Sequence, residues 1–146
     1  MKEIKRYASV HWAGDLRDGQ GQTTTESKVL DGQFYSVSSR FEKGAGTNPE
    51  ELIAAAHASC FTMMLAKIIG DLKQSLEEIN TRATVVMRID NGQARISEVH
   101  LVTEARVTGM EADSFRKAAE QAKKTCPISM LLTPGLEKMT LEANLL

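Results

Sequence analysis

The two cysteines, Cys60 and Cys126, are the residues of this 146-residue chain best suited to carry chemistry. Cys60 lies near the centre of a long apolar segment, and Cys126 directly precedes Pro127, which disfavours helical geometry in the residue before it. A cysteine in an apolar segment is most often a small core residue. One rigidly held thiol and a second on a looser helix end are also what peroxide reduction requires, because the first is oxidised to sulfenic acid and the second condenses with it to a disulfide. The cysteines alone leave both interpretations open.

Peroxide chemistry at Cys60 requires a cation near its sulfur, because only the thiolate attacks peroxide and burial raises the pKa of a cysteine. Lowering that pKa from about 8.5 to about 5.5 takes roughly 4 kcal/mol beyond what offsets desolvation. An arginine held by a carboxylate keeps its geometry better than a lysine. The candidate arginines are Arg40 and Arg17, with Glu50 as the carboxylate. The alternative is that all three are solvated surface charges.

The segment around Cys60 is predicted to form a long helix. Asn48 is a suitable N-cap, Pro49 fits the first helical position, and two glutamates follow in the first turn. From 52 to 69 the side chains are small or apolar with four polar exceptions, and Gly70 can end the helix. Such a helix is expected to be buried on every side. Its polar residues favour a core helix over a membrane span.

The rest of the chain is predicted to form strands and one further helix. The expected strands are 7–12, 22–30 and 34–37 before the long helix, and 81–89, 94–107 and 139–145 after it, with a second helix over 114–124. The second helix should stop at Cys126 because Pro127 follows. This order predicts an α+β fold in which antiparallel strands pack on a long buried helix.

Length and charge limit the possible classes of protein. The length predicts a single domain over residues 1–146. Eighteen basic and nineteen acidic residues give a net charge of −1 without a block of either sign, so neither nucleic acid nor membrane binding is expected. No apolar segment follows the first residues, which favours a cytoplasmic location, where two cysteines seldom form a permanent disulfide.

The spacing of Glu50 and Cys60 favours a dimer. The two residues are ten positions apart, about 15 Å along the axis of a regular helix, so they cannot easily meet within one chain. Either the helix start is distorted, or Glu50 reaches the Cys60 of a second subunit across a two-fold axis. A helix that is apolar all round also needs more cover than one small sheet provides, so we expect a homodimer.

Four stretches of the chain together resemble one family of enzymes. They are Arg40-Phe41-Glu42, Gly46-Thr47-Asn48-Pro49-Glu50-Glu51-Leu52, Ala55-Ala56-His57-Ala58-Ser59-Cys60-Phe61 and Cys126-Pro127-Ile128-Ser129. Over nearly its full length the chain resembles the OsmC/Ohr family of thiol peroxidases, and within it the osmotically inducible OsmC branch. The resemblance implies antiparallel sheets wrapped around the two central helices of an intertwined homodimer, with each active site at the subunit interface.

The resemblance also implies an activity and the residues that perform it. The activity is reduction of organic hydroperoxides to alcohols, with weaker action on hydrogen peroxide, in defence against oxidative and osmotic stress. Cys60 would be the peroxidatic residue that forms the sulfenic acid, and Cys126 the resolving residue that forms a Cys60–Cys126 disulfide. Arg40 with Glu50 would activate the thiol. No cofactor or metal is implied, and the reductant would be a dithiol such as dihydrolipoamide or a lipoylated protein.

The two branches of this family place the activating arginine differently. In the Ohr branch it lies in the first hairpin, where this chain has Asp15-Leu16-Arg17-Asp18-Gly19. In the OsmC branch it follows the third strand, where this chain has Arg40. The two cysteine motifs are closer to the OsmC branch, so Arg40 is the first candidate and Arg17 the second.

Two other classes of function remain as alternatives. His57 and Cys60 share one helix face, and with Cys126 and a fourth ligand from His11 or His100 they could bind a metal, although no C-x-x-C or H-x-x-x-H motif is present. The other alternative is a non-catalytic dimeric binding protein, in which the thiols merely pack and a groove beside the buried helix takes an apolar ligand.

Overall fold

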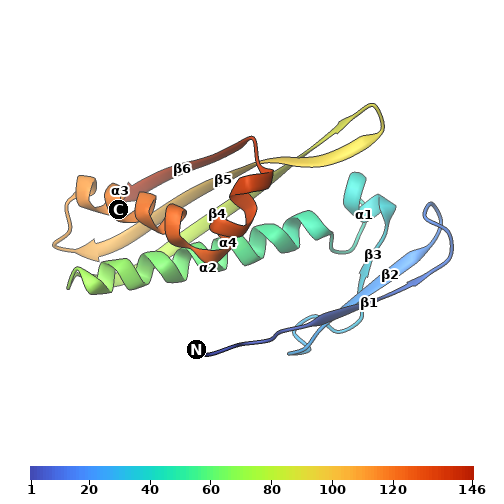
Figure 1. Cartoon of the computed structure of the whole chain (residues 1–146), viewed down its shortest axis with the longest axis horizontal. Coiled ribbons are helices and arrows are strands. Elements are labelled where there is room, and N and C mark those ends of the chain that lie inside the picture. Colours follow the sequence, from blue (N-terminus) through green and yellow to red (C-terminus); the bar gives the residue numbers. More distant parts are fainter. The chain divides into compact units, whose positions relative to one another are not determined.

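Two units, Met1–Leu52 and Ile53–Leu146, make up the chain, and the computed structural model describes all of its residues. Each unit contains one three-stranded sheet, β1-β2-β3 in the first and β4-β5-β6 in the second (Figure 1). A long helix, α2 (Pro49–Asp71), begins in the first unit and continues through the second. The α+β class with a long central helix, predicted from the sequence, is confirmed.

The first unit is a small antiparallel sheet with little apolar burial. Its strands are β1 (Ala8–Ala13), β2 (Gln20–Thr25) and β3 (Gln33–Tyr35). The rings of Trp12 and Tyr35 pack with their centroids 5.6 Å apart, and Gly21 leaves room for Tyr35 because a Cβ there would lie 2.2 Å from the ring. All buried apolar side chains of the chain belong to the second unit. The first unit therefore has no apolar core of its own.

A short helix, α1 (Val37–Phe41), follows β3 at a place where the sequence predicted the end of the third strand and no helix. Ser36 caps it by accepting the N–H of Ser39, and the Ser39 hydroxyl accepts the N–H of Ser36 in return. This reciprocal arrangement is a capping box, here built from two serines rather than from a serine and a glutamate. Arg40 consequently lies on a helix and does not close a strand.

The second unit is built on a long hairpin. Strands β4 (Ser75–Asp90) and β5 (Gln93–Thr108) pair antiparallel, and the Asn91-Gly92 turn between them has positive φ at both residues. Strand β4 begins six residues before its predicted start. Helices α3 (Ala112–Thr125) and α4 (Pro127–Leu132) and the 3₁₀ turn η1 (Thr133–Gly135) lead to β6 (Lys138–Leu145). Strand β6 pairs with β5 in parallel, so antiparallel pairing does not extend to the last strand.

One face of the second sheet carries the core. Alternate residues of β5 from Ser97 to Val107 are buried, and their apolar members pack against α2 and α3 (Figure 1). The buried side chains of α2 recur at helical spacing, so one side of the helix faces the sheet. The largest members of this cluster are Phe61, Leu65, Ile69, Leu101 and Phe115. This core fixes the part of α2 that holds Cys60.

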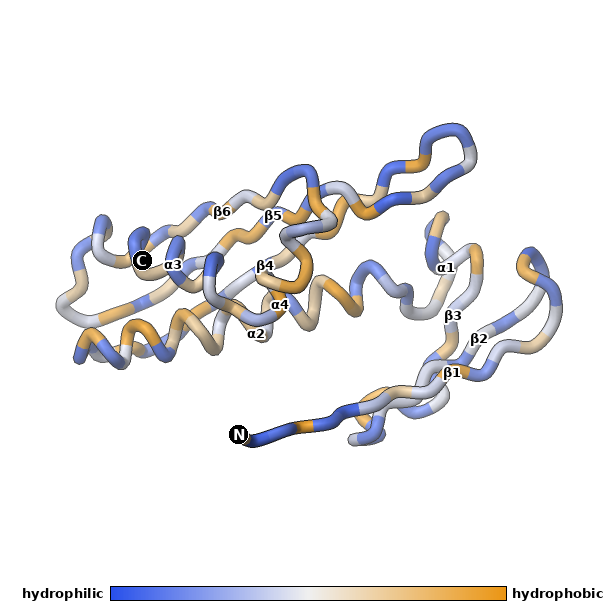
Figure 2. Tube along the Cα trace, in the orientation of Figure 1, coloured by the Kyte–Doolittle hydropathy of each residue, from blue (hydrophilic) through white to orange (hydrophobic).

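The sequence predicted a helix buried on every side. In the single chain, however, one side of α2 is exposed. Ala55, Ala56, Ser59 and Met63 are exposed, and Met63 retains 75% of its accessible surface. Apolar residues nevertheless continue along most of the helix (Figure 2). By its length and apolar composition alone α2 could cross a membrane, but the core helices of soluble proteins can have the same length and composition. One chain therefore covers only one side of an apolar helix.

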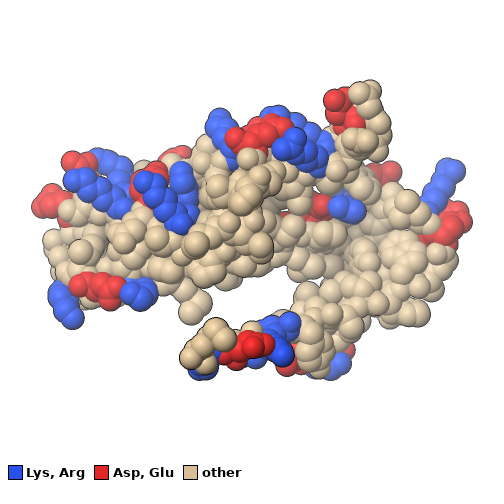
Figure 3. Space-filling view, viewed as in Figure 1, with Lys and Arg blue, Asp and Glu red and all other residues tan.

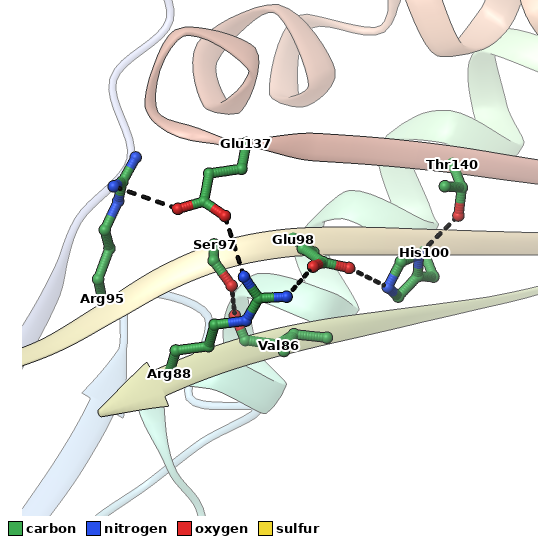
Figure 4. Close-up of polar contacts among 8 residues, drawn as sticks. All are labelled: Val86, Arg88, Arg95, Ser97, Glu98, His100, Glu137 and Thr140. Atoms are coloured by element: carbon green, nitrogen blue, oxygen red, sulfur yellow. Dashed lines mark hydrogen bonds and ion pairs between the residues drawn. The ribbon is translucent and has the colours of Figure 1, made fainter. Parts of the chain in front are cut away.

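The opposite face of the second sheet is polar. Arg88 bridges Glu98 and Glu137, and His100 lies between Glu98 and Thr140, with Nδ1 2.6 Å from the threonine hydroxyl (Figure 4). Exposed ion pairs of this kind contribute little to stability, at most about 1 kcal/mol each. On the face drawn in Figure 3, acidic and basic side chains are interspersed without a large area of one sign.

Candidate active site

Cys60 and Cys126 come from different elements of the second unit and meet at its core. Cys60 is partly exposed on α2 and packs against the core cluster. Cys126 is fully buried between α3 and α4, with φ −59° and ψ 125°. The chain leaves helical geometry at Cys126 for a local reason. Pro127 disfavours helical geometry in the residue before it, and Pro127 itself starts the next helix. The predicted end of the second helix at Cys126 is confirmed.

The two thiols are free and lie close enough for Cys126 to act on the pKa of Cys60. Burial raises the pKa of the Cys60 thiol, and the neighbouring thiol of Cys126 raises it further. The nearby backbone N–H of Ile128 lowers this pKa in part. Within the second unit no cationic side chain acts on this pKa. The unit thus brings the sulfurs together but does not by itself activate Cys60.

A buried hydrogen bond joins the two helices that carry the cysteines. His57 Nε2 lies 2.6 Å from Ser129 Oγ, and both side chains are almost completely inaccessible. Burial lowers the pKa of His57, so the ring is neutral. Its Nδ1 is buried without a hydrogen-bond partner. From the sequence, His57 was noted as a possible metal ligand and as part of the motif around Cys60, and Ser129 was noted only as part of the Cys126-Pro127-Ile128-Ser129 motif.

The geometry gives no support to the metal alternative. Nε2 of His57 is engaged by Ser129, and no three histidine, cysteine or acidic side chains of the chain are grouped so that they could hold a metal ion. His100, a suggested fourth ligand, is instead within contact distance of Glu98 and Thr140. These contacts leave the cysteines as the reactive groups of the second unit.

In the first unit, Arg40 and Glu50 form an ion pair with two points of contact. Arg40 Nη2 lies 2.8 Å from Glu50 Oε1, and Arg40 Nε lies 3.3 Å from Oε2. The hydrogen bonds to Glu50 raise the pKa of Arg40, and the guanidinium carbon also lies 5.1 Å from the centre of the Phe41 ring. Glu50 is largely buried, whereas Arg40 is about one-third exposed, with 37% of its side-chain surface accessible. The guanidinium is therefore oriented and still reachable.

Hydrogen bonds between α1 and the start of α2 hold this pair. Asn48 caps α2 by accepting the N–H at the third helical position at 2.8 Å, as its type predicted. Its amide nitrogen donates to the carbonyl of Ser39, whose hydroxyl donates in turn to the carbonyl of Thr47. Since Arg40 follows Ser39 and Glu50 lies two residues after Asn48, these bonds fix the backbone on both sides of the ion pair.

Arg17, the second candidate for the activating cation, lies in the turn between β1 and β2. It is exposed and, unlike Arg40, makes no ion pair within the chain. An arginine without a carboxylate to orient it is a solvated surface charge in this arrangement. The local geometry therefore favours Arg40.

Comparison with known proteins places the chain in a family. The model of the OsmC-like protein family matches residues 42–138. The peroxiredoxin OsmC of Escherichia coli K12 is 42% identical over 130 residues, which cover 88% of this chain and 90% of that protein. The organic hydroperoxide resistance protein of Xanthomonas axonopodis pv. citri is 26% identical over 113 residues, covering 75% and 77% of the two chains. The chain belongs to the OsmC-like family, as its cysteine motifs had indicated.

The fold agrees with solved structures of the same family. The organic hydroperoxide resistance protein OhrB of Bacillus subtilis superimposes with a TM-score of 0.73 over 94% of this chain and 97% of that one, at 24% identity. The OsmC-like protein of Mycoplasma pneumoniae gives a TM-score of 0.75 over 99% of both chains at 12% identity. At such identities the likeness concerns the fold. It supports the α+β architecture that the sequence predicted.

Proposed function

We propose that this protein is a thiol-dependent peroxidase that reduces organic hydroperoxides to alcohols. The observation that carries the proposal is that the free thiols of Cys60 and Cys126, which come from different elements, lie next to each other at the core. The names of its relatives, peroxiredoxin OsmC and organic hydroperoxide resistance protein, support this activity and a role in oxidative stress defence, and we extend the proposed role to osmotic stress.

The first step takes place at Cys60. Its thiolate sulfur attacks one oxygen of the hydroperoxide, and the O–O bond breaks as the S–O bond forms. The alkoxide that leaves takes up a proton and becomes the alcohol, while Cys60 becomes a sulfenic acid. Cys60 is suited to this role because it is the thiol that keeps some exposure, whereas Cys126 has none.

The second step joins the two cysteines. The sulfur of Cys126 attacks the sulfur of the Cys60 sulfenic acid, the S–O bond breaks, and the hydroxyl leaves as water with the proton of the Cys126 thiol. Because the two thiols already lie close together in the reduced protein, the step needs little movement of the backbone. An external dithiol then exchanges with the disulfide and restores both thiols. A lipoylated protein is our candidate for this reductant.

Activation of Cys60 is assigned to Arg40, oriented by Glu50. Burial raises the pKa of Cys60, and the N–H of Ile128 offsets this only in part, so a further positive charge is required at neutral pH. Arg40 is a cation that is oriented by Glu50 and is still accessible, so it can supply this positive charge.

We infer that this pair acts on the Cys60 of a partner subunit. Helix α2 is unbroken from Pro49 to Asp71, so the ten positions between Glu50 and Cys60 correspond to a rise of about 15 Å. Of the two arrangements that the sequence left open, a distorted helix start is disfavoured by this continuity. A second chain related by a two-fold axis is the remaining arrangement.

An intertwined homodimer also accounts for two surfaces that one chain leaves uncovered. The exposed side of α2 is lined by Ala55, Ala56 and Ser59 with Met63, small or flexible residues that allow another helix to approach closely. The first unit has no buried apolar side chain. In this proposal both units, residues 1–146, belong to one domain completed by the second subunit. We place the dimer in the cytoplasm, without cofactor, metal or nucleic acid.

Counting thiols tests the function. The reduced, metal-free protein is treated with one equivalent of cumene hydroperoxide, and free thiols and cumyl alcohol are measured. Loss of two thiols per chain with one equivalent of alcohol supports the peroxidase. Unchanged thiols support the non-catalytic binding dimer, and bound metal in the purified protein supports the metal site.

Substrate class is tested separately. An apolar site favours a bulky alkyl group by roughly 0.8 kcal/mol for each buried CH₂ and offers hydrogen peroxide no such contact. We therefore expect kcat/KM to be higher for cumene hydroperoxide than for hydrogen peroxide. Equal values would contradict the preference but not the peroxidase activity.

A further inference from the structure

The hydrogen bond between His57 and Ser129 has a regular relation to the two cysteines. His57 lies three residues before Cys60 on α2, and Ser129 lies three residues after Cys126 on α4. His57 and Cys60 share a face of α2 because they are three residues apart on one helix, and Ser129 lies in the first turn of α4, which begins directly after Cys126. The bond therefore joins the two segments directly beside the reacting sulfurs.

Breaking this bond would leave polar groups unpaired inside the protein. The exposed fractions are 0% for His57 and 1% for Ser129, and Nδ1 of His57 has no other partner. The serine hydroxyl is thus the only hydrogen-bond partner of the imidazole ring. A buried donor or acceptor that loses its partner destabilises the protein by more than an average hydrogen bond stabilises it. The bond resists separation of α4 from α2.

Helix α4 has little else to hold it at this place. It contains six residues, and of its apolar side chains Ile128 packs partly against the core, Leu132 is half-buried, and Met130 and Leu131 are 61% and 72% exposed in the single chain. Two half-buried apolar side chains give so short a helix few packing contacts of its own. The polar contact to His57 therefore helps to fix α4 beside α2.

We propose that His57 and Ser129 are positioning residues that hold Cys126 against Cys60 during turnover. This inference rests on the proposed function. The Cys60 sulfenic acid has two fates: attack by Cys126, which releases water and forms the disulfide, or attack on a second hydroperoxide, which gives the sulfinic acid and one more alcohol. Holding the Cys126 sulfur in contact raises its effective concentration and favours the first fate. The His57–Ser129 bond thereby protects Cys60 from irreversible oxidation.

The test compares variants that remove or retain this bond. Ser129→Ala removes the hydroxyl with little change in volume, and Ser97→Ala is the matched control, because Ser97 is equally buried but bonds the carbonyl of Val86 in the sheet (Figure 4). His57→Leu removes the ring nitrogens, whereas His57→Gln keeps a polar group close to the position of Nε2. Two quantities are measured: the rate of disulfide formation after one equivalent of cumene hydroperoxide, and the sulfinic fraction by mass spectrometry under excess hydroperoxide.

We expect Ser129→Ala and His57→Leu to slow disulfide formation by roughly 2- to 10-fold, the effect of one lost hydrogen bond, with a matching rise in the sulfinic fraction. The rate of the first oxidation of Cys60 should not change. Ser97→Ala should behave as the wild type, and His57→Gln should recover much of the rate that His57→Leu loses. If Ser129 had a merely structural role, both serine variants would be less stable than the wild type, but the rate of disulfide formation and the sulfinic fraction would not change.

The proposal is wrong if Ser129→Ala, shown to be folded by circular dichroism, forms the disulfide as fast as Ser97→Ala. If Ser129→Ala does not fold, equal rates in His57→Gln and His57→Leu overturn it. Failure of the proposed function looks different, because the wild-type protein would then form no Cys60–Cys126 disulfide at all.

Discussion

The guanidinium of Arg40 contacts both carboxylate oxygens of Glu50, at 2.8 and 3.3 Å, although the two residues lie on different helices. Such a two-point contact fixes the plane of the guanidinium, whereas a lysine at the same place would make a single, freely rotating contact. One edge of the guanidinium is engaged, and 37% of the Arg40 side-chain surface stays accessible. This is the arrangement that a cation needs if it is to act on a third group.

Arg40→Lys is therefore expected to slow oxidation of Cys60 at neutral pH. If the arginine lowers the pKa of Cys60 by about 3, complete loss of this effect reduces the thiolate fraction at pH 7 by roughly 30-fold, which is the upper limit for the lysine variant because lysine keeps the positive charge. The pH dependence of Cys60 alkylation by iodoacetamide in a Cys126→Ser background measures this pKa. Arg17→Lys is the control and should leave the profile unchanged. If the pKa of Cys60 changes in the Arg17 variant and not in the Arg40 variant, Arg17 is the activating residue and Arg40 is not.

The cysteine variants separate the two chemical steps. Cys60→Ser should abolish turnover, because no other thiol is exposed to substrate. Cys126→Ser should consume one equivalent of hydroperoxide, stop at the sulfenic acid and proceed to the sulfinic acid when hydroperoxide is in excess. Mass spectrometry of the oxidised protein distinguishes these states. Turnover of Cys126→Ser at the wild-type rate with a dithiol reductant would show that Cys126 is not the resolving residue.

The parts of this structure that could be predicted from the sequence depend on local signals. Asn48 and Pro49 start α2, the Asn91-Gly92 pair sets the turn of the long hairpin, and Pro127 ends α3 at Cys126. Each of these depends on the backbone preferences of one or two residues. Their effect does not depend on what the rest of the chain does, so the sequence alone identifies them.

Features that depend on distant partners were missed. The hydrogen bond between His57 and Ser129 joins residues 72 positions apart, and nothing in the local sequence of either one selects the other. The parallel pairing of β6 with β5 follows a connection through α3 and α4, and the residues of β6 alone do not reveal its direction. The apolar composition of α2 had indicated that the helix needs more cover than one chain provides, but it did not identify which residues stay exposed in the single chain.

The buried His57 should make stability depend on pH. Burial lowers its pKa below the value of about 6.5 that it has in the unfolded chain. Below about pH 6.5 the unfolded chain thus binds a proton that the folded protein does not, so the contribution of His57 is present above this pH and is lost as the pH falls towards the folded pKa. The slope amounts to at most about 1.4 kcal/mol per pH unit.

Urea unfolding of the wild type and His57→Gln at several values between pH 5 and pH 7 measures this effect. The protein concentration must be held constant, because the stability of the proposed dimer would depend on it. We expect the free energy of unfolding to fall less steeply with acidification in His57→Gln than in the wild type. Parallel curves for the two proteins would show that the imidazole does not stay neutral in the folded state.

The proposed sharing of the active site between two subunits predicts complementation between two inactive variants. Cys60→Ser lacks the nucleophile, and Glu50→Ala lacks the carboxylate that orients Arg40. Because Glu50 and Cys60 are about 15 Å apart along one unbroken helix, we expect each site to take its Cys60 from one chain and its Arg40–Glu50 pair from the other. A heterodimer of the two variants then has one site with both lesions and one site with neither.

Activity should accordingly return to about half of the wild-type value per dimer when the two variants exchange subunits. If each site lay within one chain, both sites of the heterodimer would carry a lesion and no activity would return. Coexpression with two different affinity tags and sequential purification isolates the heterodimer, and a heterodimer of Cys60→Ser with the wild type serves as the reference for one intact site. A verified Cys60→Ser/Glu50→Ala heterodimer that stays inactive while this reference is active would rule out the shared arrangement and leave the two-cysteine chemistry unaffected.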